Sequence, residues 1–351
     1  MAIDKPTDHF NVLTWTGDGN TSREINGLDF QPDFVWSKLR SHANDHYLAN
    51  SVIGSNKNLE SDETASEITD NTYGYLTSFD NDGFTAQKGS GTFYNFNSSA
   101  DEFVAWCWKA GTSFSNDASA TGVGTIDSTG SVNTDAGISI MSYTGNGSNS
   151  ASFAHGLGVK PQIVLIKNRS TAKNWVYWQD TTGNGTSDIR LVLNLTNSNY
   201  NNYHVTFGTT TITLGNTDDA WNKSGDNLIA YCFAEKKGYS KFGSYTGNNQ
   251  DPDGTFVYTG FAPAWVMAKK TDGTHDWTIK DNKRPGYNEN NKNLNANLSN
   301  AEESNDEVDF LSNGFKWRDN DGASNASNTY IYMAFAESPF VNSNGVPTNA
   351  R

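Results

Sequence analysis

The sequence predicts an all-β fold built from three tandem β-sandwich-like repeats of about 100 residues each. Three observations lead to this prediction: the composition, a set of markers that recurs three times, and continuous apolar runs of strand length. Of the 351 residues, 13% are aromatic and 18% are charged, and Asn, Ser, Thr and Gly crowd the remainder. This balance is typical of strands joined by turns.

Two markers recur at nearly constant spacing along the chain. The first is an aromatic residue followed by Thr-Gly, at Trp15, Tyr143 and Tyr245. The second is a proline that lies 16, 17 and 17 residues after the Thr of each copy and six residues before a lysine. The prolines are Pro32, Pro161 and Pro263, and the lysines are Lys38, Lys167 and Lys269. Matched spacing in three copies indicates an internal repeat.

A third marker, an apolar and aromatic run, closes each repeat at residues 103–108, 228–233 and 330–335. The markers divide the chain into unit 1 (residues 1–111), unit 2 (138–237) and unit 3 (238–351), with a Gly/Ser/Thr-rich linker at 112–137. Spaced apolar residues also allow this linker to lie extended along a neighbour. Cys107 and Cys232 share one repeat position, so we expect two buried apolar fillers and no disulfide between them.

Each unit is expected to form strands at its apolar runs. The run after each proline predicts a strand that is covered on both faces, with the proline at its start. The closing run is expected to pair in the same sheet. Asp82-Gly83 and Asn313-Gly314 predict hairpin turns, and the Thr-rich residues 206–213 replace this turn in unit 2. Short helical pieces are expected around residues 62–68 and 300–306.

Charge and composition exclude several classes of function. The chain has 25 Lys and Arg against 39 Asp and Glu, and this net charge of −14 argues against nucleic acid and anionic lipid as partners. We expect no signal peptide and no membrane insertion, because long apolar stretches are missing. No cofactor is expected, since neither a nucleophile elbow nor a phosphate-binding loop is present. We therefore expect a protein without catalysis, because tandem copies of a scaffold suit binding or assembly.

Metal ligands are not expected either. His42 and His46 have helical spacing but polar neighbours, and no second pair of ligands accompanies them. His46 lies 14 residues after its proline, as Trp175 and Trp277 do, so we expect it to fill an aromatic slot of the repeat. The acidic turns at residues 80–83 and 319–322 lack the EF-hand spacing. We interpret them as hairpin turns, with adventitious calcium binding as the alternative.

Six residues are candidates for contact with a glycan or a partner protein: Trp175, Tyr177, Trp178, Trp277, Lys167 and Lys269. The aromatic residues lie in polar surroundings, which predicts either sugar-stacking platforms or core packing. The two lysines end apolar runs, as Lys38 does. This position predicts either ligands for an anionic glycan or protection of a strand edge.

Residues 143–147 and 153–170, which include His155-Gly156-Leu157-Gly158 before Pro161, resemble a β-rich repeat domain of unknown function in structural proteins of marine tailed bacteriophages. Residues 27–36 and 97–111 of unit 1 are similar to the same family. The resemblance covers most of the chain, although unit 3 lacks the His-Gly-Leu-Gly step. It implies a virion surface protein and names no catalytic residues.

From this resemblance we expect a surface-exposed tail fibre or host-receptor-binding component of the virion, made in the host cytoplasm and placed on the tail or capsid. The expected partners are other virion proteins and host surface glycan. We also expect homo-oligomerisation, a trimer by analogy, to multiply weak contacts. One alternative is a capsid decoration, head fibre or knob protein, favoured by the lack of a heptad-repeat stalk. A further alternative is a glycan-active, tailspike-like enzyme.

Overall fold

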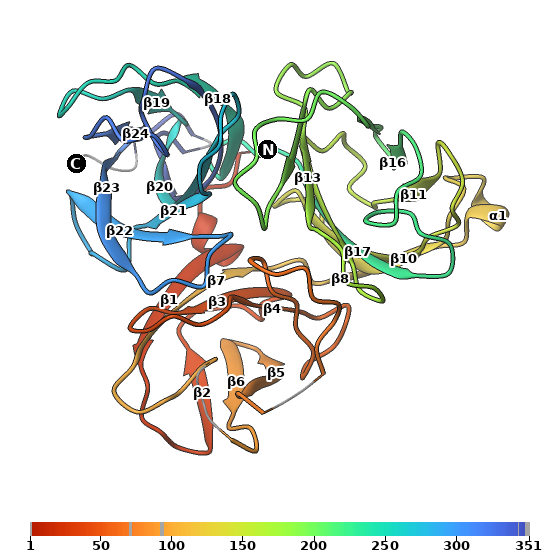
Figure 1. Cartoon of the computed structure of the whole chain (residues 1–351), viewed down its shortest axis with the longest axis horizontal. Helices are drawn as coiled ribbons and strands as arrows, with labels where there is room; N and C mark the ends of the chain where they lie inside the picture. Colours follow the sequence, from red (N-terminus) through yellow and green to blue (C-terminus); the bar gives the residue numbers. More distant parts are fainter. Residues whose placement is uncertain (1, 70–71, 92–94, 343, 348–351) are drawn as a thin grey trace.

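The structure, a computed structural model, describes residues 2–69, 72–91, 95–342 and 344–347. Its strands pair in antiparallel sheets, so the predicted all-β class is confirmed. Figure 1 shows three lobes around a common centre, and the colours place the three predicted units in separate lobes.

Unit 1 has a four-stranded sheet in the order β1-β7-β3-β4 and a smaller sheet in the order β2-β6-β5. A short 3-10 helix, η1, precedes the first strand. The elements are η1 (Pro6–Asp8), β1 (Phe10–Thr16), β2 (Ser22–Asn26), β3 (Phe34–Leu39), β4 (Tyr47–Asn50), β5 (Tyr75–Asp80), β6 (Gly83–Gln87) and β7 (Glu102–Trp108).

Unit 2 has a seven-stranded sheet in the order β14-β13-β12-β17-β10-β9-β8 and a smaller sheet in the order β11-β16-β15. The elements are β8 (Thr112–Asn116), α1 (Ala118–Thr121), β9 (Ser128–Asn133), β10 (Ile138–Thr144), β11 (Ser152–Ala154), β12 (Ile163–Asn168), β13 (Val176–Gln179), β14 (Ile189–Val192), β15 (Val205–Phe207), β16 (Thr211–Leu214) and β17 (Asn227–Phe233).

Unit 3 forms one continuous eight-stranded sheet in the order β18-β25-β20-β21-β22-β23-β24-β19. The strands are β18 (Ser240–Thr246), β19 (Phe256–Tyr258), β20 (Phe261–Lys270), β21 (Thr278–Asp281), β22 (Asn290–Asn295), β23 (Glu303–Leu311), β24 (Gly314–Trp317) and β25 (Thr329–Pro339).

The strands that carry the sequence markers have the same order in each unit. The order β1-β7-β3-β4 of unit 1 matches β10-β17-β12-β13 of unit 2 and β18-β25-β20-β21 of unit 3. In each unit the closing run pairs with the strand that follows the proline, as predicted. Pro32 and Pro161 precede their strands. Pro263 instead lies inside β20 at a register shift, where a missing N–H group is tolerated.

Residues 112–137 are not a flexible linker but follow the alternative, an extended stretch that lies along a neighbouring strand. β8 and β9 form a hairpin, and β9 pairs with β10 from Ser128 opposite Tyr143 to Asn133 opposite Ile138. Within the same stretch Ile126 is buried. Enough apolar side chains are therefore present in this Gly/Ser/Thr-rich stretch to extend the sheet of unit 2 along its edge.

The predicted short helices are also wrong. Residues 62–68 are irregular, and residues 303–306 belong to β23. In the first segment, contacts with the next unit replace local helical hydrogen bonds: the backbone N–H of Glu67 donates to the carbonyl of Arg169. The hairpin turns predicted at residues 82–83 and 313–314 are confirmed between β5 and β6 and between β23 and β24.

Alternation along the closing strands explains why their sequences are apolar throughout. In β7, Trp106 and Trp108 face a central core, whereas Ala105 and Cys107 face a core under the smaller sheet of unit 1. Both faces of the strand are therefore covered, as predicted. Cys107 and Cys232 are buried and not bonded to each other, which confirms that prediction.

The central core is shared by the three units. Rings from different units meet there, with centroid distances of 4.6 Å for Phe34 and Tyr231, and 5.7 Å for Trp108 and Trp265. Phe335 of unit 3 stacks on Phe10 of unit 1 at 5.2 Å. Because each unit buries one face of its sheet against the other two, we infer that the units fold as one cooperative body.

A close approach of two backbone segments explains the Thr-Gly marker. A Cβ atom on Gly17, Gly145 or Gly247 would lie 1.8, 2.3 or 2.0 Å from a carbonyl oxygen of a neighbouring loop, so glycine alone fits there. A fully buried asparagine holds the same loop in each unit. In unit 2 this residue is Asn222, which accepts the N–H of Asn146 and donates to the carbonyl of Ser148. Asn97 and Asn325 hold the loops of units 1 and 3 in the same way.

Candidate functional site

The four aromatic candidates lie in the interior rather than on the surface. Trp175, Tyr177, Trp178 and Trp277 are each at most 1% exposed. The indole N–H of Trp175 donates to the carbonyl of Glu60 in unit 1 at 2.6 Å, and that of Trp277 donates to the carbonyl of Val192 in unit 2 at 3.1 Å. The sugar-platform interpretation of these residues is therefore wrong, and the packing interpretation is confirmed.

His46, at the equivalent position of unit 1, contacts unit 3, just as Trp175 contacts unit 1 and Trp277 contacts unit 2. Its Nε2 lies 3.0 Å from the carbonyl oxygen of Asn295 in unit 3, and its Nδ1 accepts the indole N–H of Trp36 at 2.8 Å. The imidazole is 1% exposed, which confirms that it fills the aromatic slot. Burial holds its pKa well below the ordinary value, so the ring is neutral.

The two lysine candidates are buried as well, so neither the glycan interpretation nor the edge-protection interpretation is correct. Lys167 and Lys269 are 0% exposed, and Lys38 is 1% exposed. The Nζ of Lys38 donates to the carbonyl of Ser299 in unit 3, and that of Lys167 to the carbonyl of Thr64 in unit 1. Burial lowers their pKa values to about 8 for Lys38, about 7 for Lys167 and about 8 for Lys269. These ammonium groups thus satisfy carbonyls inside the molecule.

A polar pocket of about 470 Å³ opens on unit 1 instead. Three segments form it: the end of the loop before β4, the irregular stretch between β4 and β5, and the stretch before β7. Its lining combines three carboxamides, two carboxylates, one phenol ring and one aliphatic side chain. The lining residues are Asn44, Asp45, Asn58, Glu60, Ile68, Tyr73 and Asn95.

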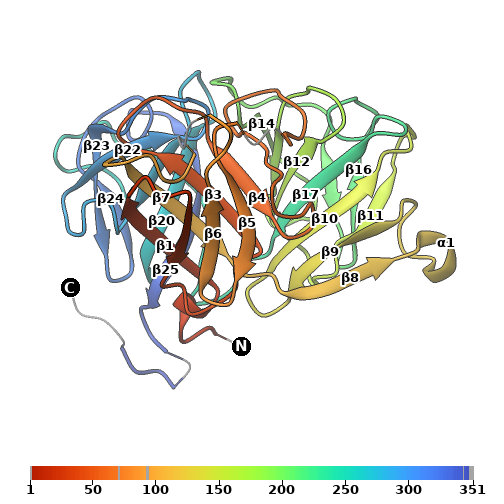
Figure 2. The same ribbon diagram turned by 90° about the horizontal axis from the view of Figure 1, so that it is seen from below.

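The pocket lies at the end of the molecule away from both termini. β1 and β3 both pair antiparallel with β7, so they run in the same direction, away from the N-terminal segment. Asn44 and Asp45 follow β3 at that far end. The backbone N–H of Ile3 donates to the carbonyl of Lys237, and β25 contacts η1, so the two chain ends lie together. Figure 2 shows both termini on one side of the molecule.

Several polar groups of the pocket have no partner in the part of the chain that the structure describes. The side chain of Asn58 lines the pocket and is 94% buried, since the residue is 6% exposed, yet its carboxamide bonds to no described residue. The carboxylates of Asp45 and Glu60 likewise form no hydrogen bond or ion pair with described residues. Buried polar groups are normally satisfied. These three groups, beside the 54% exposed ring of Tyr73, are available to a ligand.

Burial and the charges of neighbouring carboxyl groups raise the pKa values of two carboxyl groups around the pocket, those of Glu60 and Asp62. Burial, followed by the charges of Asp45 and Asp62, raises the pKa of Glu60 to about 8. Burial and the charge of Asp45 raise the pKa of Asp62 to about 7, against the hydrogen bond that Asp62 accepts from the N–H of His46. The Oδ2 atom of Asp62 has no partner among the described residues. These groups therefore hold protons near neutral pH.

The pairing of two carboxyl groups is peculiar to unit 1. In all three units a side-chain oxygen accepts the backbone N–H of the residue in the aromatic slot. In units 2 and 3 the amide nitrogen of the same side chain also donates to the residue just before that slot. In unit 2 this second contact is an amide–amide bond of 2.9 Å, and in unit 3 it is an amide–carboxylate bond of 2.6 Å. The equivalent pairs are Asp62 with Asp45, Asn194 with Asn174, and Asn297 with Asp276.

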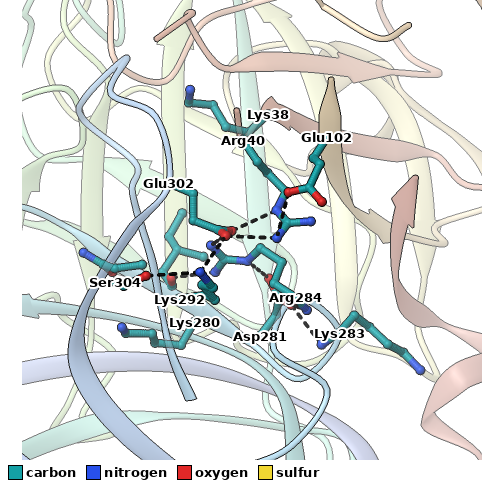
Figure 3. Close-up of polar contacts among 12 residues, drawn as sticks. Lys38, Arg40, Glu102, Lys280, Asp281, Lys283, Arg284, Lys292, Glu302 and Ser304 are labelled. Atoms are coloured by element: carbon teal, nitrogen blue, oxygen red, sulfur yellow. Dashed lines mark hydrogen bonds and ion pairs between the residues drawn. The ribbon is translucent and has the colours of Figure 1, made fainter. Parts of the chain in front are cut away.

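A separate ionic cluster lies between units 1 and 3 (Figure 3). Arg284 contacts Asp281 at 2.6 Å and Glu302 at 3.1 Å, and Arg40 makes two bonds of 2.9 Å to Glu302. Trp106 donates its indole N–H to Asp281 at 3.0 Å. Although burial alone raises the pKa of Asp281, the charge of Arg284 holds it below the ordinary value. Because the charged side chains of this cluster pair with one another, we interpret the cluster as a structural contact that links units 1 and 3.

Among the described residues, no three His, Cys, Asp or Glu side chains are arranged to hold a metal ion. The acidic turn at residues 319–322 is not a hairpin turn, contrary to our interpretation. It leads from β24 toward β25, and the carboxylate of Asp319 accepts the hydroxyl of Ser324 at 2.9 Å. Within the same residues, the helices are all too short to cross a bilayer.

Sequence reasoning missed the pocket because its residues lie outside the three markers. The substitution of Asp62 for the asparagine of the other units was the one available signal. It follows the aromatic slot by 16 residues, whereas Asn194 and Asn297 follow it by 19 and 20. Because this spacing varies, the equivalence of Asp62, Asn194 and Asn297 can be recognised only from the structure.

Comparison with known proteins gives a family but no curated relative. No curated protein and no solved structure shows significant similarity to the chain. A family described as a domain of unknown function, DUF7483, matches residues 5–339. The match runs through all three units without a break, in keeping with their shared core. The chain therefore belongs to the DUF7483 family.

Proposed function

We propose that the protein is a non-catalytic, surface-exposed component of a tailed-phage virion that binds a host surface glycan through the pocket of unit 1. The observation that supports glycan binding is a set of polar groups in the pocket that have no partner among the described residues: the amide of Asn58 and the carboxyl groups of Asp45 and Glu60, beside the ring of Tyr73. Amides and carboxylates suit sugar hydroxyls, and an exposed ring suits the apolar face of a sugar. The virion assignment rests on the resemblance of the sequence.

The architecture suits such a role. The shared core gives the pocket a rigid support, and binding residues commonly lie on loops held by a rigid scaffold. The pocket also lies beyond the end of β3 that is farther from the N-terminal segment. We expect other virion proteins to bind the side on which the two termini lie. We expect self-association into a trimer to multiply a weak single-site affinity. Light scattering on the full chain tests the trimer, and the mass of one chain would contradict it.

Binding of the full chain to an array of bacterial surface glycans tests the glycan proposal. We expect at least one polysaccharide to bind, and we expect Tyr73→Ala and Asn58→Ala to weaken this binding. Tyr287→Ala is the matched control, because Tyr287 is a 79% exposed tyrosine of unit 3. A bound glycan whose affinity is unchanged in both pocket variants would contradict the assignment of the site. The absence of any bound glycan would contradict the function.

Gold-labelled antibody against the chain, applied to intact virions, tests the location. Label on the tail is the expected result for a receptor-binding component. Label over the head would instead make the protein a capsid decoration protein, and unlabelled virions would contradict the virion assignment.

One observation favours a second candidate, a glycan-active enzyme. Glu60, whose pKa burial raises to about 8, shares the pocket with a second carboxyl group, that of Asp45, and glycoside hydrolysis uses two carboxyl groups, of which the general acid has a raised pKa. The pocket is open to water beside Tyr73, which favours binding over a water-excluding catalytic site. A reducing-sugar assay on the bound glycan decides between the two. We expect no release, and release that is lost in Glu60→Gln would establish the enzyme instead.

A further inference from the structure

We propose that the pocket of unit 1 selects a glycan that carries a protonated amine, such as an oligosaccharide of free amino sugars, over neutral and anionic glycans. This inference rests on the proposed function of the same site. It differs from one of the two interpretations of the sequence, in which Lys167 and Lys269 bind an anionic glycan.

The charges around the pocket are the first argument. Two carboxyl groups, those of Asp45 and Glu60, line it, and no lysine or arginine is among the described lining residues. The nearest buried lysines, Lys38 and Lys167, donate their protons to backbone carbonyls of Ser299 and Thr64. Their ammonium groups are therefore occupied elsewhere, and an anionic sugar would meet carboxylates without a cation to offset them.

The free hydrogen-bonding capacity of the pocket is the second argument. An ammonium group has three donors and no acceptor. The pocket supplies acceptors in matching kind: the carboxylates of Asp45 and Glu60 and the carboxamide oxygen of the buried Asn58, none of them bonded to a described side chain. The remaining lining, the amides of Asn44 and Asn95 and the ring of Tyr73, suits a polyhydroxylated body rather than a purely aliphatic amine.

Binding of an amine at this pocket is coupled to the release of protons, which can be measured. Because Glu60 has a pKa of about 8 and Asp62 one of about 7, both carboxyl groups are largely protonated in the free protein at pH 6. A bound cation favours their ionised forms, so binding of an amine releases protons to the buffer. Binding of a neutral sugar has no such requirement.

Isothermal titration calorimetry of the full chain at pH 6 tests the inference with three oligosaccharides of equal length: glucosamine, N-acetylglucosamine and galacturonate. We expect the glucosamine oligomer to bind about tenfold more tightly than its acetylated form and the galacturonate to bind most weakly, as charge-assisted contacts imply. We also expect its enthalpy to change between buffers of different ionisation enthalpy, which reports proton release.

Two charge-removing variants and a matched control complete the test. Asp45→Asn and Glu60→Gln keep the shape of each side chain, and each is expected to remove most of the preference for glucosamine. Glu24→Gln makes the same substitution on an exposed part of β2 in unit 1, outside the pocket, and is expected to preserve the preference. Equal affinity for the acetylated and free amine, or a preference for galacturonate, would overturn the inference while leaving glycan binding intact. Failure of all three to bind overturns the inference too, and the array described above then decides the proposed function separately.

Discussion

Replacement of Asp62 by asparagine is expected to stabilise the protein more at pH 8 than at pH 5. The folded-state pKa of Asp62 is about 7, above the ordinary value of 3.8. Between these values the folded chain holds a proton that the unfolded chain has released, so the free energy of unfolding falls as the pH rises. The loss is complete once the pH passes the folded-state pKa. Above that pH, a charged Asp62 faces Asp45 with Oδ2 unpaired.

The magnitude follows from the equivalent pair in unit 3. An amide at position 62 can donate to Asp45 as Asn297 donates to Asp276 at 2.6 Å. It replaces a buried unsatisfied oxygen with a bond to a charged group, which is expected to contribute about 1–3 kcal/mol. At pH 5 the folded chain still holds the proton and the protonated Asp62 can make the same donation, so the variant gains less than at pH 8. The lysine beside this pair, Lys38, has its counterpart in Lys269 beside Asp276, so Asp62→Asn gives unit 1 the charges that unit 3 already has.

Urea unfolding of the wild type and Asp62→Asn at pH 5 and pH 8 measures this difference. The converse substitution Asn297→Asp, which creates a carboxyl pair in unit 3, is the matched control and is expected to destabilise the protein at pH 8 more than at pH 5. The reasoning is refuted if Asp62→Asn has the same effect at both pH values, or if it destabilises the protein at pH 8.

Three other substitutions and one truncation test the remaining account. Gly145→Ala places a Cβ 2.3 Å from the carbonyl oxygen of Lys223, and urea unfolding should show a loss of about 1–3 kcal/mol or more. Asn222→Ala leaves the Asn146 loop without its buried partner, at a cost of about 1–3 kcal/mol and with faster amide exchange in that loop. Asp281→Asn leaves the buried guanidinium of Arg284 without a full counter-charge and should cost about 3–5 kcal/mol; a loss below about 1 kcal/mol would contradict the structural role of the cluster. Scanning calorimetry of the full chain should show one transition, whereas residues 112–237 alone, which expose their share of the central core, should show none.

The fold class was predictable because its determinants are local. Continuous apolar runs such as residues 103–108 predict strands covered on both faces, and the structure covers them with the central core on one side and the smaller sheet of unit 1 on the other. The dipeptides Asp82-Gly83 and Asn313-Gly314 mark hairpins because they favour tight turns. The constant spacing between markers also identifies which strands of the three units are equivalent.

Burial between units was not predictable from local pattern. Lys167 and Lys269 end apolar strands, where a lysine ordinarily meets water, yet here a neighbouring unit or the next residue supplies carbonyl oxygens at that point. Trp175 and Trp277 have polar neighbours in sequence because the surfaces that cover them come from other units. The prediction of a flexible linker at 112–137 was wrong for a related reason, because β10 has an edge with which β9 pairs.

The pocket was invisible to sequence reasoning because tertiary structure assembles it. Asp45, Glu60 and Asn95 come from three segments without regular secondary structure, and none of the segments has a recognisable motif. Asn58 and the two carboxyl groups share one property, the lack of a side-chain partner among the described residues, and this property exists only once the chain is folded.

A crystal structure of the full chain soaked with the tightest-binding oligosaccharide tests the central claim most directly. The account predicts a sugar in the pocket of unit 1, within hydrogen-bond distance of the Asn58 carboxamide and against the ring of Tyr73, with its amine between Asp45 and Glu60. A sugar bound at another place, with this pocket empty at saturating ligand, would contradict the account.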